Sequence, residues 1–197
     1  MIDEKFVLLA ALLNIIGSTG YAIDTIKGKN RPNRVTWLLW AIAPLIAFSA
    51  EIGEGVGWQS LMTFMVGFGP LMIFIASFVN KKAHWKISKL DIVCGGLSVA
   101  ALVLWLVTGT GIIAIIFCII ADLLAAIPTV IKSFNSPQTE SYGVFRNGAL
   151  SAAITLLTID DWTFAHYGFP LYILLICALL YGLIRFKIGA RIKTFSM

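Results

Sequence analysis

Charged residues are scarce in this sequence. Only 13% of its 197 residues are Asp, Glu, Lys or Arg, whereas 59% are hydrophobic and the mean hydropathy is +0.90. Soluble globular domains carry about 25% charged residues, so the composition excludes that class and predicts an integral membrane protein. The formal net charge of +5 does not indicate nucleic-acid binding, because the charges lie between apolar segments instead of forming one patch.

Cysteine and histidine are equally rare. Cys94, Cys118 and Cys177 lie in apolar segments at unrelated spacings, which argues against a disulfide framework or a zinc site. His84 and His166 have no second ligand nearby, so we expect neither a metal site nor a cofactor. The N-terminus lacks a basic region followed by a small-residue cleavage site, so its first apolar run is predicted to be a retained helix.

Long apolar runs dominate instead. Seven segments approach the ~20 residues that a helix needs to cross a bilayer. They cover residues 6–26, 35–50, 58–79, 90–108, 111–134, 141–159 and 163–186. The run from 90 to 134 is split at Gly109-Thr110-Gly111, because one helix of that length would overshoot any membrane. The sequence predicts an all-α integral membrane protein with seven transmembrane helices.

The connectors alternate in charge. Basic residues follow the first, third, fifth and seventh segments: Lys27, Lys29, Arg31 and Arg34; Lys81, Lys82, Lys86 and Lys89; Lys132; and Arg185, Lys187, Arg191 and Lys193. Acidic residues occupy the other side: Asp3, Glu4, Glu51, Glu54, Asp160 and Asp161, with Lys5 as the exception. By the positive-inside rule, the N-terminus is expected outside the cell membrane and the C-terminus in the cytoplasm.

The chain also contains an internal repeat. Residues 25–33 (TIKGKNRPN) align with residues 130–138 (VIKSFNSPQ) at an offset of 105, and residues 69–73 (GPLMI) align with 169–173 (FPLYI) at an offset of 100. This pattern predicts two helix triplets joined by a spare fourth helix, which gives both triplets the same orientation. The predicted units are a first bundle at 1–80, a basic loop and linker helix at 81–110, and a second bundle with a basic tail at 111–197.

This 3+1+3 layout, with a basic turn after the first helix of each triplet, resembles the SWEET and PQ-loop transporter superfamily. In that family the first helix of each triplet ends in Pro-Gln. Here Pro128-Thr129 and Ile23-Asp24 take those places, whereas the literal Pro137-Gln138 falls in the connector. The resemblance implies a transporter that moves a small polar metabolite by alternating access between two three-helix bundles. The asparagine expected on the third helix of each triplet in sugar carriers is missing, which counts against a simple sugar carrier.

Asp122 is the sharpest candidate for a functional residue. It lies about eleven residues from either end of the fifth segment, close to the bilayer midplane. A carboxylate at that depth costs several kcal/mol unless it faces a cavity or a partner, so a functional site is the default hypothesis. We expect it to bind substrate or to couple protons. A structural hydrogen bond or ion pair with Arg146 or Asn147 is the alternative.

The predicted substrate-binding residues are Asp122, Arg146, Asn147, Trp40, Tyr172 and Asn14. Arg146 and Asn147 would lie about 9 Å inside the sixth segment, although Arg146 can also snorkel to the interface. Asn14 suits interhelical packing as well as a cavity wall. Trp37, Trp58 and Tyr142 are expected chiefly in the interfacial aromatic belt, with a stacking pocket for a planar solute as the alternative. The predicted hinges are Pro44, Pro70, Pro128 and Pro170, which are alternatively static bends.

The leading hypothesis is therefore a transporter of a small polar solute in the lipid bilayer, with protons as the candidate coupling ion. A seven-helix receptor, sensor or scaffold that binds a ligand without transporting it is the alternative. A rhodopsin is excluded because residues 163–184 contain no lysine for a Schiff base. An enzyme is not expected, because neither HExxH nor GxSxG occurs. One chain holds both bundles, so we expect a monomer or a small homo-oligomer.

Overall fold

The structure is a computed structural model that describes residues 2–80, 85–108 and 111–195. These residues form the helices α1 (Phe6–Ile26), α2 (Arg34–Gly53), α3 (Ser60–Ala76), α4 (Lys89–Thr108), α5 (Gly111–Asn135), α6 (Tyr142–Leu157), α7 (Phe164–Arg185) and α8 (Ile188–Phe195), with a short 3-10 turn, η1 (Pro137–Thr139). The described ranges contain no strand, so the predicted all-α class is confirmed.

Helices α1 to α7 correspond to the seven predicted segments, and their ends differ from the prediction by at most three residues. Helix α8 was not predicted, because its eight residues were assigned to a basic tail. It follows Lys187, whose φ of 50° separates it from α7, and it packs on α5 and α7. The predicted turn residues Gly109 and Thr110, like Lys81, Lys82 and His84, lie outside the described residues.

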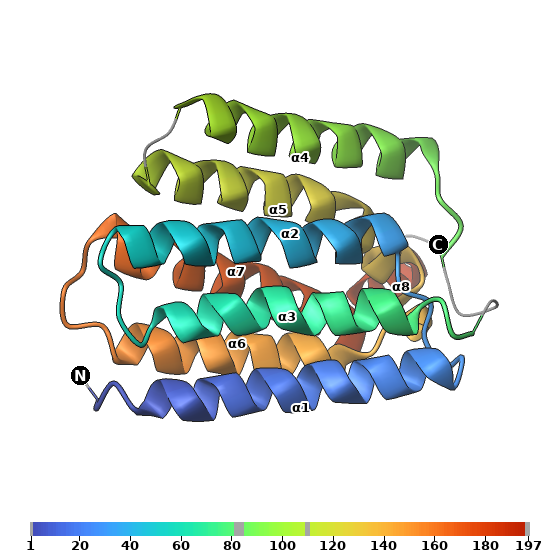
Figure 1. Ribbon diagram of the computed structural model, residues 1–197. Helices are drawn as coiled ribbons and strands as arrows, with labels where there is room; N and C mark the ends of the chain where they lie inside the picture. The colour runs from blue at the N-terminus through green and yellow to red at the C-terminus, as the bar shows by residue number, and fades with distance from the viewer. Residues whose placement is uncertain (1, 81–84, 109–110, 196–197) are drawn as a thin grey trace.

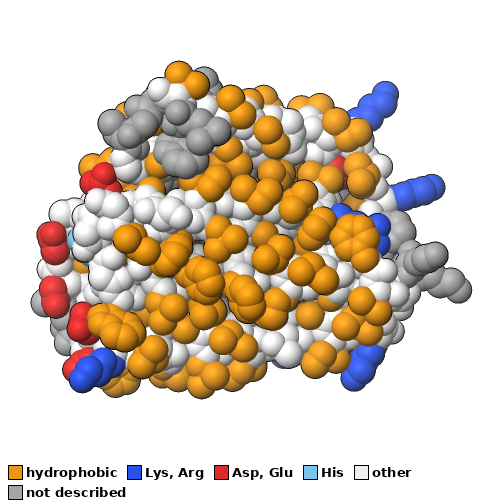
Figure 2. Space-filling view, in the orientation of Figure 1, with side chains coloured by type: hydrophobic (Ala, Val, Ile, Leu, Met, Phe, Trp, Pro, Cys, Tyr) orange, Lys and Arg blue, Asp and Glu red, His pale blue; other side chains and the backbone are white. Residues whose placement is uncertain are grey.

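The outer surface of the bundle is apolar. Helices α1, α2, α5 and α7 are long and apolar enough to cross a membrane, and α3 is a shorter apolar helix. Large side chains such as Leu8, Leu12 and Ile16 of α1 are about half exposed, and Figure 2 shows apolar side chains spread over the face between the two ends. Apolar surface this extensive is rare on soluble monomers, and it is compatible with the predicted membrane protein.

The helices pack in a pattern that is regular with respect to the chain. Helix α3 packs on both α1 and α2, and α7 packs on both α5 and α6. Helices α1–α3 form one set and α5–α7 form the other. The two sets meet where α1 contacts α6 and where α2 contacts α5. The list of contacting pairs is unchanged when α1 is exchanged with α5, α2 with α6 and α3 with α7. Helix α4 lies at the edge of the bundle, against α5 and α2 (Figure 1).

Successive long helices run in opposite directions, so the connectors alternate between the two ends of the bundle (Figure 1). One end, here called the acidic end, exposes Asp3, Glu4, Glu54, Asp160 and Asp161. The opposite end, here called the basic end, exposes Lys27, Lys29, Arg31, Lys89, Arg185 and Lys187. Figure 2 shows these charges at opposite ends of an apolar band. The predicted alternation of charge is therefore present in the folded chain.

Small residues allow the helices to approach closely. A Cβ atom built on Gly67 of α3 would lie 2.7 Å from Cγ of Leu45 and 3.1 Å from the carbonyl oxygen of Ala41, both on α2. A Cβ atom on Gly69 would lie 2.2 Å from Oγ of Ser18 on α1. Glycine at such positions is typical of membrane helices, whose association depends on close packing and not on a hydrophobic driving force.

We predict that Gly67→Ala destabilises the protein by about 1–3 kcal/mol, the usual cost of overpacking a tight interface. The matched control is Gly20→Ala on α1, where a built Cβ meets nothing within 4 Å. Thermal unfolding of the two purified variants in one detergent should show a lower midpoint for Gly67→Ala only. Equal midpoints would contradict the close α2–α3 contact.

Candidate functional site

An internal cavity of about 60 Å³ lies between the two sets of helices. All six helices of the two sets contribute to its wall: Asn14 and Ser18, Trp37 and Trp40, Val66 and Pro70, Asp122, Val144, Phe145 and Gly148, and Ile173, Ile176, Cys177 and Leu180. This volume fits about two waters at ~30 Å³ each. It is far below the ~300 Å³ of the smallest usual small-molecule pockets, so the cavity has room for only a small group.

Asp122 supplies the carboxylate in this wall, and only 2% of the residue is exposed. Its Oδ2 accepts a hydrogen bond from the hydroxyl of Tyr172 at 2.6 Å, whereas its Oδ1 has no hydrogen-bond partner among the described residues. The indole nitrogen of Trp40 donates to the backbone oxygen of Asp122 at 3.2 Å. Three of the predicted site residues, on α5, α7 and α2, thus form one connected group.

Aromatic rings cover one side of the cavity. The ring centroids of Trp37 and Trp40 are 5.2 Å apart, and Phe145 lies 6.3 Å from the first and 6.2 Å from the second. Trp40 and Phe145 are separated by the repeat offset of 105, so equivalent positions of the two copies meet here. The prediction that Trp37 belongs to an interfacial belt is wrong. Its residue is 1% exposed, because α2 turns this side chain towards α6.

Asn14 combines the two roles considered for it. Its residue is 7% exposed, its side-chain nitrogen donates to Oγ of Ser151 on α6 at 2.5 Å, and it also borders the cavity. The amide therefore joins α1 to α6, the contact between the two helix sets, at the level of the cavity. A polar side chain in hydrocarbon needs such a partner, and the hydroxyl of Ser151 supplies it.

Arg146 and Asn147 lie apart from the cavity group. Arg146 is exposed, and its guanidinium donates to Oδ1 of Asn147 at 3.1 Å. Asn147 is buried and donates to the backbone oxygen of Leu13 on α1 at 3.1 Å. The ion pair of Arg146 with Asp122, one alternative for that acid, is not formed. Tyr172 is its hydrogen-bond partner instead.

The four prolines predicted as hinges lie inside helices α2, α3, α5 and α7, and all are buried: Pro44, Pro70, Pro128 and Pro170. Pro70 borders the cavity. Proline lacks the N–H that would complete the ladder at each position. Each set of helices therefore contains two positions at which the helical hydrogen-bond ladder is interrupted.

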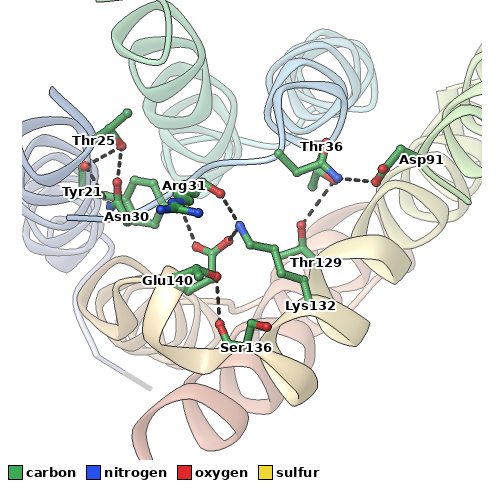
Figure 3. Close-up of polar contacts among 12 residues, drawn as sticks. Tyr21, Thr25, Asn30, Arg31, Thr36, Asp91, Thr129, Lys132, Ser136 and Glu140 are labelled. Carbon is green, nitrogen blue, oxygen red and sulfur yellow. Dashed lines mark hydrogen bonds and ion pairs between the residues drawn. The ribbon is translucent and has the colours of Figure 1, made fainter. Parts of the chain in front are cut away.

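A buried network at the basic end was not predicted. Lys132 near the end of α5 forms an ion pair with Glu140 at 2.6 Å, and their side chains are 1% and 0% exposed. Tyr21 of α1 donates to the other oxygen of Glu140, and the Lys132 ammonium donates to the backbone oxygen of Arg31. Figure 3 shows these four residues converging. Arg31 and Glu140 come from the two repeated connectors, Tyr21 from α1 and Lys132 from α5. The backbone nitrogen of Arg31 also donates to the oxygen of Thr139 at 2.9 Å.

Further polar contacts extend this network, as Figure 3 shows. Thr25 near the end of α1 donates to Oδ1 of Asn30 in the first connector at 2.7 Å. Thr129 of α5 donates to the hydroxyl of Thr36 on α2 at 3.3 Å. Asn33 donates to Asp91 at the start of α4. Both connectors and four helices, α1, α2, α4 and α5, are thereby joined at the basic end.

Sequence reasoning treated Lys132 only as a topology charge and overlooked Glu140. The available signal was that Glu140 is an acid within a connector that is otherwise basic, which breaks the alternation of charge. Glu51 was likewise treated as a connector charge. It lies inside α2 with 1% exposure, accepts from Thr63 at 3.0 Å, and its Oε2 has no hydrogen-bond partner in the described part of the chain.

Residues 2–80, 85–108 and 111–195 contain no cluster of His, Cys, Asp and Glu that could hold a metal ion. Comparisons with protein-family models, with curated proteins and with solved structures find no match for this chain. The function proposed below therefore depends on the cavity and on the network at the basic end.

We predict that Lys132→Met destabilises the protein by about 3–5 kcal/mol, because it leaves Glu140 buried without its partner charge. The double variant Lys132→Met/Glu140→Gln should recover much of this loss. Lys29→Met is the matched control, because Lys29 pairs with Asp24 at 3.5 Å with its side chain 67% exposed, and exposed pairs contribute at most ~1 kcal/mol. Unfolding midpoints in detergent measure all three. Equal effects of the two single variants would show that Lys132 is not in a buried pair.

Proposed function

We propose that this chain is a membrane transporter that moves a small polar solute by alternating access between two three-helix bundles, α1–α3 and α5–α7. The observation that carries the proposal is the small cavity between these sets, with the unpaired Oδ1 of Asp122 in its wall. In transporters built from repeats, the substrate site lies near the bilayer midplane at the interface between the repeats.

The packing supports the proposed 3+1+3 layout. The helix contacts are unchanged when the two sets are exchanged, as a duplicated architecture requires. Helix α4 lies at the edge of the bundle. Of the six helices in the two sets, it contacts α5 and α2. One additional crossing between two copies of three helices gives both copies the same orientation. In this proposal α4 is the linker helix that provides that crossing.

Asp122 is the group proposed to couple transport to an ion. Acids inside membrane helices are rare, and those found usually face a cavity on a substrate or proton pathway. Asp122 fits this description because it is buried, borders a cavity and keeps one oxygen unpaired. The hydroxyl of Tyr172 holds the other oxygen and thereby orients the carboxyl group.

The network at the basic end is proposed to close the cavity towards the cytoplasm. Lys132, Glu140 and Tyr21 join the end of α5, the fifth connector and α1. Opening on this side requires these contacts to separate. Pro128 lies one helical turn before Lys132, at a break in the α5 ladder, so it is placed to act as the hinge.

A receptor or scaffold that binds a ligand without transporting it is the second candidate. The small volume of the cavity favours it, since about 60 Å³ suits a bound ligand group better than a pathway through the membrane. The two candidates differ in one measurable property: only a transporter moves its ligand across a sealed membrane.

The test begins with a thermal-shift screen of sugars, amino acids, organic acids, amines and vitamins on the purified full chain. A solute present at 100 times its dissociation constant adds about 2.7 kcal/mol of stability. We predict that the best hit enters proteoliposomes in a saturable manner and that Asp122→Asn abolishes this uptake. Asp161→Asn, an exposed acid at the acidic end, is the control and should transport normally. A hit that binds but does not enter would favour the receptor.

We also predict that the basic end faces the cytoplasm, because positive charges favour that side. Lys29→Cys and Asp161→Cys place one exposed thiol at each end, while Cys94 and Cys118 are buried and Cys177 is half-buried. A membrane-impermeant maleimide should label Asp161→Cys in intact cells and Lys29→Cys only after permeabilisation. Wild type provides the background from the native thiols. The reverse labelling pattern would invert the proposed orientation.

A further inference from the structure

The cavity has a carboxylate but no described basic side chain to neutralise it. Arg146 is exposed and bonds to Asn147, and the Lys132 ammonium is held by Glu140. The hydroxyl of Tyr172 is a neutral donor, and it serves only Oδ2 of Asp122. A buried charge left without its partner typically costs several kcal/mol. A positively charged ligand would remove that cost at the point where Oδ1 is unpaired.

The remaining wall suits the apolar part of such a ligand. Trp37, Trp40 and Phe145 are buried and present a cluster of rings, and most other lining residues are aliphatic. A cation within about 6 Å of an aromatic ring is attracted to its face, most strongly when water is excluded. The polar side chains of Asn14 and Ser18 are too few for a polyol, whose buried hydroxyls would each need a partner.

We propose that the cavity binds a small organic cation, a primary or methylated ammonium group whose charge Asp122 neutralises and whose carbon atoms contact the rings of Trp37, Trp40 and Phe145. The volume of about 60 Å³, about that of two waters, admits only a small ammonium head. A ligand as large as choline therefore binds only if the wall of the cavity moves outward. This inference rests on the proposed function, since it names the class of solute that the transporter would carry. An anion or a sugar fits this site less well, because the wall offers a carboxylate and few polar partners.

The test compares choline with 3,3-dimethyl-1-butanol, a neutral molecule of the same shape in which carbon replaces nitrogen. Both are titrated onto the purified full chain in a non-ionic detergent, with binding measured by calorimetry and thermal shift. Choline should bind at least ten-fold more tightly than the neutral analogue. Ethanolamine should also bind more tightly than that analogue, because it carries the same charge. Equal affinities for choline and the analogue would overturn the proposal without any variant.

Two variant pairs locate the binding. Asp122→Asn should abolish the preference for choline, whereas Asp161→Asn should keep it. Phe145→Leu should weaken choline binding several-fold, while Phe64→Leu should not, because the ring of Phe64 packs on Phe48 and Phe68 and does not border the cavity. Choline preference that persists in Asp122→Asn would place the site elsewhere and refute the proposal.

Uptake into phosphatidylglycerol liposomes, which contain no choline lipid, separates this inference from the proposed function. Choline that binds with the predicted preference but does not enter would support the cation site and overturn transport. Saturable uptake of a neutral solute, with no binding of choline or ethanolamine, would keep transport and overturn the cation site. Stabilisation by phosphatidylcholine but not by free choline would also overturn it, because the ligand would then be a lipid headgroup.

Discussion

The buried ion pair between Lys132 and Glu140 lies in the second half of the molecule. Its hydrogen bonds with Tyr21 and with the backbone oxygen of Arg31 join it to the first half, where the repeated connectors meet. Neither side chain reaches solvent, so the pair is stable only because Tyr21 and the backbone oxygen of Arg31 satisfy their remaining hydrogen-bonding capacity. These hydrogen bonds fix the positions of the first connector, the end of α5 and α1 relative to one another. The cavity lies farther into the bundle, between the same two halves, so its shape depends on how these halves are positioned.

The duplication is symmetric in helix packing but not in its polar residues. At the offset of 105, Asp122 corresponds to Gly17, and Lys132 corresponds to Lys27, which is exposed. A larger side chain at Gly17 would be crowded, because a built Cβ would lie 3.0 Å from Cβ of Asn147 on α6. One copy therefore supplies both the cavity acid and the buried lysine. A single acid between the two sets of helices is consistent with one ligand site in the proposed transporter, not two.

Much of the fold was predictable because its signals are local. The apolar runs, their lengths and the alternating charges identified seven helices with nearly correct ends, whereas α8 was missed because eight polar and apolar residues show no long run. The candidate site was predictable in part. Asp122, Trp40, Tyr172 and Asn14 were selected by their depth in the segments, but the network at the basic end was not. Its members lie up to 119 residues apart, and charge alone made Lys132 and Glu140 resemble connector residues.

Hydrophobicity and charge along the chain are sufficient to locate the helices and to assign the connectors to the two ends. Both signals depend only on a residue's own transfer free energy and on its neighbours in sequence. Which polar groups meet depends on how the helices pack, and nothing local encodes it. The tertiary structure alone showed that Asp122 bonds to Tyr172 and not to Arg146, and that Trp37 lies inside the bundle. It also showed that Glu51 and Glu140 are buried. The physical reason is that a buried polar group is stabilised only by specific partners, and here those partners come from distant segments.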